Sequence, residues 1–173
     1  MALTDSQTSA LAQIAAAAVT CETETGFPAE ISTAQCILES AWLTRMAAPF
    51  NCFGIKATDS NQAYCITHEY LNGSWETCKL AFESYPDLAA CFAAHARLIL
   101  SGKPYRVAWE QYLTDDPFLR ASQSASHRLD ELIRGIAPVY ATDPNYAGEL
   151  LTLAHGPHVT AALVAARAKG GAA

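Results

Sequence analysis

One short segment does most to limit the folds open to this chain, because it carries the clearest strand pattern. Residues 63–71 and 74–82 are rich in aromatic and β-branched side chains, and the dipeptide Asn72-Gly73 lies between them. This dipeptide is typical of the two-residue turn of a β-hairpin. Counting outward from the turn places Glu69 opposite Glu76, with both side chains on one face. The segment therefore predicts one antiparallel hairpin.

The rest of the sequence predicts helices, because apolar residues recur three and four positions apart after capping residues or prolines. We expect helices over residues 4–20, 28–46, 85–101, 107–113, 129–136, 143–154 and 157–170. No linker or repeat divides these segments. We therefore expect residues 1–173 to form a single, predominantly helical α+β domain, with its core over about residues 11–153 and an additional C-terminal helix over about residues 157–169.

The second expected helix carries an acidic residue in apolar surroundings. Glu39 lies in the middle of this helix, with Cys36, Trp42 and Leu43 three and four positions away. A carboxylate is costly to ionise among apolar groups, so we expect the pKa of Glu39 to be raised. A carboxyl group that keeps its proton near neutral pH is what a glycosidase needs to protonate a departing sugar oxygen. An ordinary exposed helix glutamate is the alternative.

Composition argues against several classes of partner. The formal charge is −6 at pH 7 and no stretch is rich in lysine and arginine, so we expect neither nucleic acid nor a membrane as a partner. The longest apolar run, residues 10–19, is too short to cross a bilayer and lacks the pattern of a signal peptide, so we expect no export signal in this chain. The five histidines form no metal-binding pattern, and we expect no metal and no other cofactor.

Cysteines are numerous for a chain of this size. The six are Cys21, Cys36, Cys52, Cys65, Cys78 and Cys91. None of them shows the C-x-x-C spacing of a zinc site. The even number suits disulfides, and Cys65 and Cys78 are diagonal neighbours in the predicted hairpin. Burial as small apolar residues explains Cys36 and Cys91 equally well, so the pairing and the compartment stay open.

Four motifs follow one another along the chain. They are AQCILESAW (34–42), NCFGIK (51–56), THEYLNG (67–73) and YATDPNYAGEL (140–150). Together they resemble glycoside hydrolase family 73, the flagellar-type and autolysin-type β-N-acetylglucosaminidases that cut bacterial peptidoglycan. Cys52 stands where this family often has leucine. The resemblance implies a lysozyme-like domain whose hairpin lies over the substrate cleft, acting on peptidoglycan glycan strands at the cell wall, in the periplasm or outside the cell; we expect a monomer.

The resemblance also implies three catalytic residues. Glu39 matches the general acid of the family. Glu69, in the hairpin, matches a second carboxylate that could activate water or stabilise positive charge on the sugar. Tyr140 matches a tyrosine that lines the cleft near the acid, where its hydroxyl could bind the substrate or a charged intermediate. Two solvated glutamates on a surface hairpin, and a tyrosine used only for packing, are the alternatives.

Six further residues are expected to contact the substrate. They are Asn51, Phe53, Gly54, Tyr70, Glu76 and Tyr146. Aromatic rings such as Phe53 could stack on the apolar faces of sugars, and Gly54 permits close approach of the backbone to a ligand. Glu76, opposite Glu69, would raise its pKa because like charges repel.

These observations predict hydrolysis of the β-1,4 bond that follows N-acetylglucosamine, with Glu39 as the general acid. A muramidase or a lytic transglycosylase on the same fold is one alternative, and a non-catalytic wall-binding domain is another. The separation of Glu39 and Glu69 would distinguish inversion from retention, and the sequence does not determine it.

Overall fold

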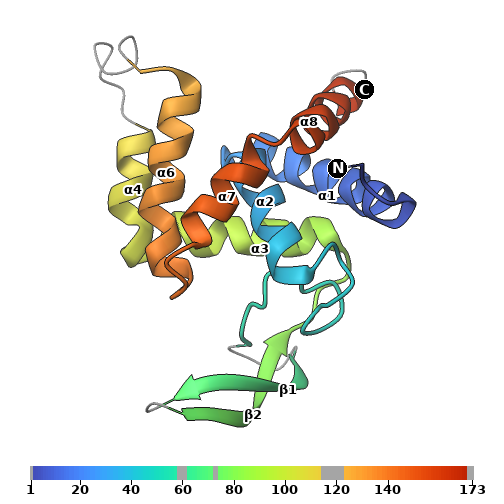
Figure 1. The fold of residues 1–173 in the computed structure, drawn as a ribbon, viewed down its shortest axis with the longest axis vertical. Helices are drawn as coiled ribbons and strands as arrows, with labels where there is room; N and C mark the ends of the chain where they lie inside the picture. The colour runs from blue at the N-terminus through green and yellow to red at the C-terminus, as the bar shows by residue number, and fades with distance from the viewer. Residues whose placement is uncertain (1, 58–61, 72–73, 114–122, 171–173) are drawn as a thin grey trace.

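The computed structural model describes residues 2–57, 62–71, 74–113 and 123–170, of which residues 62, 67–71, 74–76 and 78 are described by their backbone alone. It consists of a helical body from which one hairpin projects (Figure 1). Along the chain the elements are α1 (Asp5–Thr25), α2 (Ala29–Ser40), β1 (Gln62–Leu71), β2 (Ser74–Glu83), α3 (Leu88–Ser101), the short 3-10 helix η1 (Lys103–Tyr105), α4 (Arg106–Tyr112), α6 (Ala125–Tyr140), α7 (Tyr146–Ala154) and α8 (Pro157–Gly170).

The hairpin has the predicted register. β1 and β2 pair antiparallel, with Glu69 opposite Glu76 and Thr67 opposite Cys78. The turn residues Asn72-Gly73 lie outside the described part of the chain. The prediction succeeds because a two-residue turn leaves only one way to pair the flanking strands.

The N-terminal helix α1 is longer than predicted. It begins as expected, with Thr4 and Gln7 forming a capping box in which each side chain accepts a hydrogen bond from the other residue's backbone N–H. It continues past residue 20 to Thr25 and ends at Gly26, whose φ of 75° is readily adopted only by glycine. Burial of Cys21 extends its apolar face by one turn beyond the alanine-rich segment.

The prediction that α2 continues to residue 46 is wrong. The helix ends at Ser40, and Ala41, Trp42 and Leu43 follow with φ of 46°, 62° and 63°. The Ser40 hydroxyl donates to the Cys36 carbonyl at 2.6 Å and accepts from the Leu43 N–H at 2.9 Å, so it closes the turn that ends the helix. Glu39 is therefore in the last turn of α2 rather than in its middle.

Helix α7 also begins later than predicted. Asp143 does not cap it, since its carboxylate accepts from the Asn145 N–H at 2.8 Å and forms a local turn instead. The first residue of α7 is consequently Tyr146. Helix α6 is longer than the predicted residues 129–136, because Ser124 caps it by accepting from the His127 N–H. The predictions for α4 and α8 agree with the structure to within one residue, whereas α3 begins at Leu88, three residues later than predicted, because Asp87 caps it by accepting from the Ala90 N–H.

One core joins all the helical elements. Its largest fully buried side chains include Phe27 and Ile31 at the start of α2, Phe92 of α3 and Leu132 of α6. Leu163 of α8 belongs to the same cluster. Helix α2 lies in the middle of the body, and its C-terminal end points toward the hairpin (Figure 1). None of the described helices is long and apolar enough to cross a membrane.

Candidate active site

The structure brings Glu39 together with a tyrosine from a distant part of the sequence. Glu39 stands in the last turn of α2, and Tyr146 opens α7, 107 positions further along the chain. The Tyr146 hydroxyl donates a hydrogen bond of 2.8 Å to Oε1 of Glu39. Tyr146 is buried, so its ring is fixed by packing and its hydroxyl holds the carboxyl group in place. The packing of α7 against α2 brings these two residues together.

The protein environment keeps the carboxyl group of Glu39 closer to its neutral form. The residue as a whole is exposed, but its carboxyl end is bound to a buried tyrosine and is partly removed from water. This desolvation raises the pKa of Glu39 above its usual value, and the hydrogen bond from Tyr146 opposes the rise by a smaller amount. The raised pKa predicted from the sequence is confirmed in direction.

Gln35 is a member of this cluster that sequence reasoning missed. It is fully buried on α2, one turn before Glu39, and its Nε2 donates to the Tyr146 hydroxyl oxygen at 3.4 Å. An amide N–H cannot accept a proton, so the hydroxyl proton of Tyr146 is left to point at Glu39. The available signal was a glutamine four positions before the acid, inside an otherwise apolar stretch of helix.

Both tyrosines of the last motif remain protonated. Burial, followed by the nearby charge of Glu39, raises the pKa of Tyr146 well above its usual value. Burial raises the pKa of Tyr140 in the same direction. Tyr146 is therefore a hydrogen-bond donor to Glu39 near neutral pH.

Tyr140 packs its ring against the ring of Tyr146. The two rings are parallel, with centroids 5.9 Å apart and an interplanar angle of 5°. The Tyr140 hydroxyl donates to the backbone carbonyl of Phe53 at 3.2 Å. The structure thus places Tyr146, rather than Tyr140, in direct contact with the acid, while Tyr140 connects α6 to the loop that carries Phe53.

A buried histidine continues the row of rings into the core. His95 of α3 stacks on Phe53 with centroids 3.8 Å apart, and it meets Tyr140 edge-on at 5.8 Å. Neither of its ring nitrogens has a hydrogen-bond partner. Burial lowers the pKa of His95 to about 3, so the ring is neutral and packs as an aromatic group.

Phe53 and Asn51 lie behind the site rather than on its surface. The ring of Phe53 is 4 % exposed and packs in the core, which leaves no free face for a sugar. Asn51 is also buried: its Nδ2 donates to the carbonyls of Ile55 and Glu83, both at 2.9 Å, and its Oδ1 accepts from the Ile55 N–H. Asn51 thereby holds together the two chain segments at the root of the hairpin.

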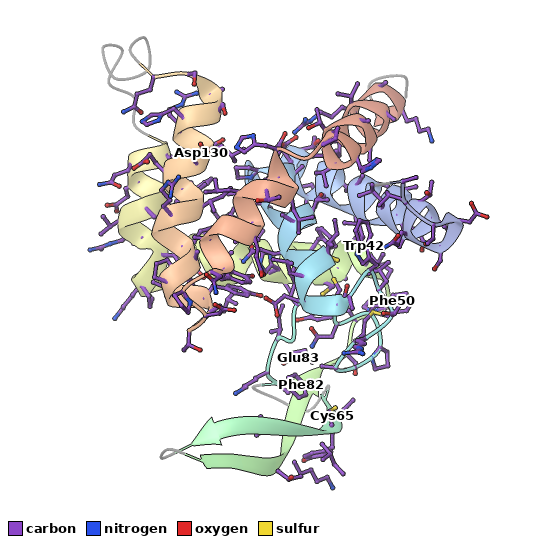
Figure 2. All side chains as sticks on the ribbon, viewed as in Figure 1. Trp42, Phe50, Cys65, Phe82, Glu83 and Asp130 are labelled. Atoms are coloured by element: carbon purple, nitrogen blue, oxygen red, sulfur yellow. The ribbon has the colours of Figure 1, made fainter. Side chains whose placement is uncertain are left out.

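The other predicted site residues are Gly54, which the structure describes fully, and residues of the hairpin, which it describes by their backbone alone. Gly54 is exposed with φ of 64° and open space around it, so the surface next to Phe53 is accessible. The backbone pairs Glu69 with Glu76 and Tyr70 with Trp75. The side chains of these residues lie outside the described part of the structure, and their roles stay predictions. Figure 2 shows Phe82 and Glu83 where β2 meets the helical body, above the hairpin that carries them.

Other features of the surface add no second candidate centre. A hollow of about 530 Å³ is lined by residues of α4 and α6 such as Tyr112 and Arg128, and Glu39 is not among its lining residues. Among the described residues, no three histidine, cysteine, aspartate or glutamate side chains are placed to hold a metal ion. The candidate site therefore follows from the hydrogen bonds of Glu39.

Comparison with known proteins identifies a matching family. Residues 15–156 match the glucosaminidase family described as mannosyl-glycoprotein endo-β-N-acetylglucosaminidase. The chain belongs to this family. The resemblance inferred from the four sequence motifs is thus confirmed, and the glucosaminidase family is one of glycoside hydrolases.

Similar sequences include a probable N-acetylmuramidase and an autolysin. A probable N-acetylmuramidase of Lactococcus lactis is 32% identical over 159 residues, which are 86% of this chain and 33% of the relative. An autolysin of Enterococcus faecalis is 33% identical over 132 residues, 70% of this chain and 16% of the relative. The chain therefore spans a third or less of the length of these two relatives.

Solved structures of an autolysin domain and of a glycoside hydrolase domain show the same fold. The catalytic domain of the autolysin Auto from Listeria monocytogenes aligns with a TM-score of 0.71 at 21% identity, covering 94% of this chain and 90% of that one. The glycoside hydrolase domain of FlgJ from Salmonella typhimurium aligns with a TM-score of 0.63 at 20% identity, covering 98% of both chains. The predicted lysozyme-like, predominantly helical α+β fold is confirmed.

Proposed function

We propose that this domain is a peptidoglycan hydrolase that cleaves the β-1,4 bond after N-acetylglucosamine, with Glu39 as the general acid. The observation that carries the proposal is the hydrogen bond from the buried Tyr146 to a carboxyl group whose pKa is raised by desolvation. A carboxyl group that is held in one orientation and has a raised pKa is suited to deliver a proton at a defined point. Membership of the glucosaminidase family supplies the class of bond.

The hydrogen-bonding pattern suggests how the carboxyl group works. Oε1 of Glu39 accepts from Tyr146, so in this scheme Oε2 carries the acidic proton and delivers it to the substrate. Transfer of this proton to the glycosidic oxygen lets the bond to the sugar break and leaves a carboxylate on Glu39. Tyr146 stabilises that carboxylate through the same hydrogen bond, and Gln35 keeps the tyrosine proton directed toward it.

The second half of the reaction requires a group on the other side of the sugar. We assign it to Glu69 of the hairpin or to the acetamido group of the substrate itself, either of which can stabilise the cationic sugar. Water then adds to that carbon, and its released proton restores neutral Glu39. The site uses no cofactor in this scheme.

Cleavage of the neighbouring linkage is the second candidate. The Lactococcus relative is named a probable N-acetylmuramidase, which favours this alternative over a purely binding role. A lytic transglycosylase, which needs only one carboxyl group, would be favoured if Glu69 proved dispensable. The non-catalytic alternative is disfavoured by the position of Glu39 beside Tyr146 and Gln35, because a binding domain needs no carboxyl group of raised pKa.

The similarity to an autolysin and to a probable N-acetylmuramidase supports action at the cell wall. We propose that the domain acts there as a monomer on glycan strands. Its formal charge of −6 does not favour adhesion to an anionic wall, so retention at the wall would depend on the glycan-binding site or on another protein. Co-sedimentation with purified walls at several salt concentrations tests this: binding that weakens with salt would contradict it.

The reaction is tested on purified peptidoglycan. The released fragments are reduced with borohydride and analysed by mass spectrometry. Fragments with N-acetylglucosamine at the reduced end, absent with the Glu39→Gln variant, are expected. Fragments ending in muramic acid or its anhydro form would move the cut to the other linkage. No release from several wall types would overturn the enzymatic assignment.

A further inference from the structure

Three buried thiols lie together beneath the candidate site. Cys36 is on α2, one turn before Glu39, Cys52 is in the segment between α2 and β1, and Cys91 is on α3. All three side chains are at most 1 % exposed. The sulfur atoms of Cys52 and Cys91 are 3.7 Å apart although the two residues are 39 positions apart in the sequence. Cys52 therefore lies between two helices, each of which carries a cysteine.

From this geometry we propose that Cys52 and Cys91 form a disulfide site, which on oxidation joins the root of the hairpin covalently to α3. The sulfur–sulfur separation exceeds a disulfide bond by less than 2 Å, a difference that small side-chain and backbone adjustments can close. The backbone groups of Cys52 and Phe53 also lie next to the sulfur of Cys91, so the two chain segments are already in contact.

The positions of Cys52 and Cys91 in the fold determine what a bond between them would connect. Cys52 directly follows Asn51, whose side chain binds the carbonyls of Ile55 and Glu83 at the two ends of the hairpin root. Both strands lie between Cys52 and Cys91 in the sequence. A bond between these two sulfurs encloses the whole hairpin in one covalent loop and ties its root to the helical body.

The chemistry is an ordinary thiol–disulfide exchange with glutathione disulfide as the oxidant. One thiolate attacks the oxidant and releases one glutathione thiol, and the second thiolate displaces the other glutathione from the mixed disulfide. Two protein thiols are oxidised and one disulfide of the oxidant is reduced, with two protons passing to the released thiolates.

The environment of the thiols decides when this exchange takes place. The neighbouring thiol of Cys36, together with burial, raises the pKa of Cys52, and the neighbouring Cys52, together with burial, raises the pKa of Cys91. Thiolates are therefore scarce in the folded chain. The bond therefore forms while the chain folds, and a reductant reaches it again when heating opens the fold.

Two other cysteines serve as internal references. Cys21 is also buried, but its thiol donates to the Phe92 carbonyl and lies 3.7 Å from the Thr25 hydroxyl instead of beside a cysteine. It should stay reduced. Cys36 competes with Cys91 for Cys52, and a bond between Cys36 and Cys52 would contradict the proposal.

The test is oxidative refolding of the whole chain in a glutathione redox buffer, followed by alkylation, digestion without reductant and mass spectrometry. We expect a cross-linked pair of peptides that contain Cys52 and Cys91, with Cys21 and Cys36 alkylated. Alkylation of both Cys52 and Cys91, or a link between Cys36 and Cys52, would overturn the proposal. This measurement needs no variant and does not depend on hydrolytic activity.

Thermal unfolding supplies a second readout. In a Cys65→Ser background, which removes the pair possible within the hairpin, addition of a reductant should lower the melting temperature by about 10 °C. The further substitution Cys52→Ser should abolish this difference, and Cys21→Ser should preserve it. A melting temperature that does not respond to reductant in the Cys65→Ser protein would contradict the proposal.

Discussion

The two carboxylates expected to act in this domain stand on very different supports. Glu39 is at the end of a helix in the middle of the body, with a buried tyrosine bonded to it and a buried glutamine behind the tyrosine. Glu69 is on a hairpin that projects from that body and whose strands pair with each other (Figure 1). The acid is therefore held in position before substrate binds, whereas the position of the second carboxylate depends on where the hairpin places it.

The largest expected effect comes from the acid itself. Glu39→Gln removes the transferable proton while keeping the shape of the side chain, so kcat on peptidoglycan should fall about 1,000-fold. The release of soluble fragments measures this. Glu149→Gln on α7, an exposed position, is the matched control and should leave the rate unchanged. Similar rates for the two variants would remove Glu39 from the mechanism.

A smaller loss of activity is expected from substitution of the carboxylate in the hairpin. Glu69→Gln should lower kcat by about 10- to 100-fold, because the acetamido group of the substrate can take over part of its role. Glu76→Gln, on the facing strand, should have less effect. If Glu39→Gln and Glu69→Gln lowered kcat equally, the two carboxylates would be equally well positioned, contrary to this expectation.

Removal of the tyrosine hydroxyl should change the pH profile as well as the rate. The hydrogen bond from Tyr146 favours the ionised form of Glu39 and lowers its pKa. Tyr146→Phe should therefore raise that pKa, moving the alkaline limb of the kcat profile to higher pH, and should lower kcat about 10-fold. Tyr64→Phe, an exposed tyrosine of β1, should change neither. An unshifted limb would show that Tyr146 does not act on the carboxyl group.

Gln35 should give a weaker form of the same effect. Gln35→Leu keeps the approximate volume but removes the donor to Tyr146, so we expect a fall in kcat of about three-fold with little change in KM. Gln35→Glu offers the tyrosine an acceptor instead, which competes with Glu39 for the hydroxyl proton. The alkaline limb should then move as in Tyr146→Phe. Identical profiles for wild type and Gln35→Glu would refute the orienting role.

The smallest effect on catalysis is expected from the core histidine, which instead affects stability. His95 has a pKa of about 3 when folded against a usual 6.5, so between these values the unfolded chain binds more protons and stability falls as the pH falls. His95→Phe should remove this loss and leave kcat at pH 7 unchanged. Urea unfolding at pH 7 and pH 4.5 measures it, with the exposed His127→Phe as control. If the His95→Phe variant lost as much stability between pH 7 and pH 4.5 as the wild type, the burial of a neutral His95 ring would be contradicted.

Sequence patterns predicted those features that depend on local chemistry. The pairing of Glu69 with Glu76 followed from Asn72-Gly73, because a turn of two residues determines the register of its strands. The direction of the pKa shift of Glu39 was also predicted, although Trp42 and Leu43, on which the prediction relied, follow the end of α2 instead of lying on its face. Both predictions use residues that are adjacent along the chain or on one helix face.

Features set by distant contacts were not predictable in this way. The end of α2 depends on three non-glycine residues with positive φ, for which the sequence has no signature. The position of Tyr146, rather than Tyr140, beside the acid depends on the packing of α7 on α2, two helices that are far apart in the sequence. Asn51 and Phe53 lie in a motif that suggests a surface, yet their side chains are used internally.

The left-handed turn after Ser40 has an electrostatic consequence. Each of its three non-glycine residues costs ~1–2 kcal/mol in this conformation, and the turn ends α2 one residue after Glu39. The aligned peptide dipoles of a helix leave a partial negative charge at its C-terminal end, which disfavours a carboxylate there. A helix continuing to residue 46 would have placed Glu39 far from that end. The strained turn thus puts the acid at the negative pole of its own helix, where the macrodipole helps it to keep its proton.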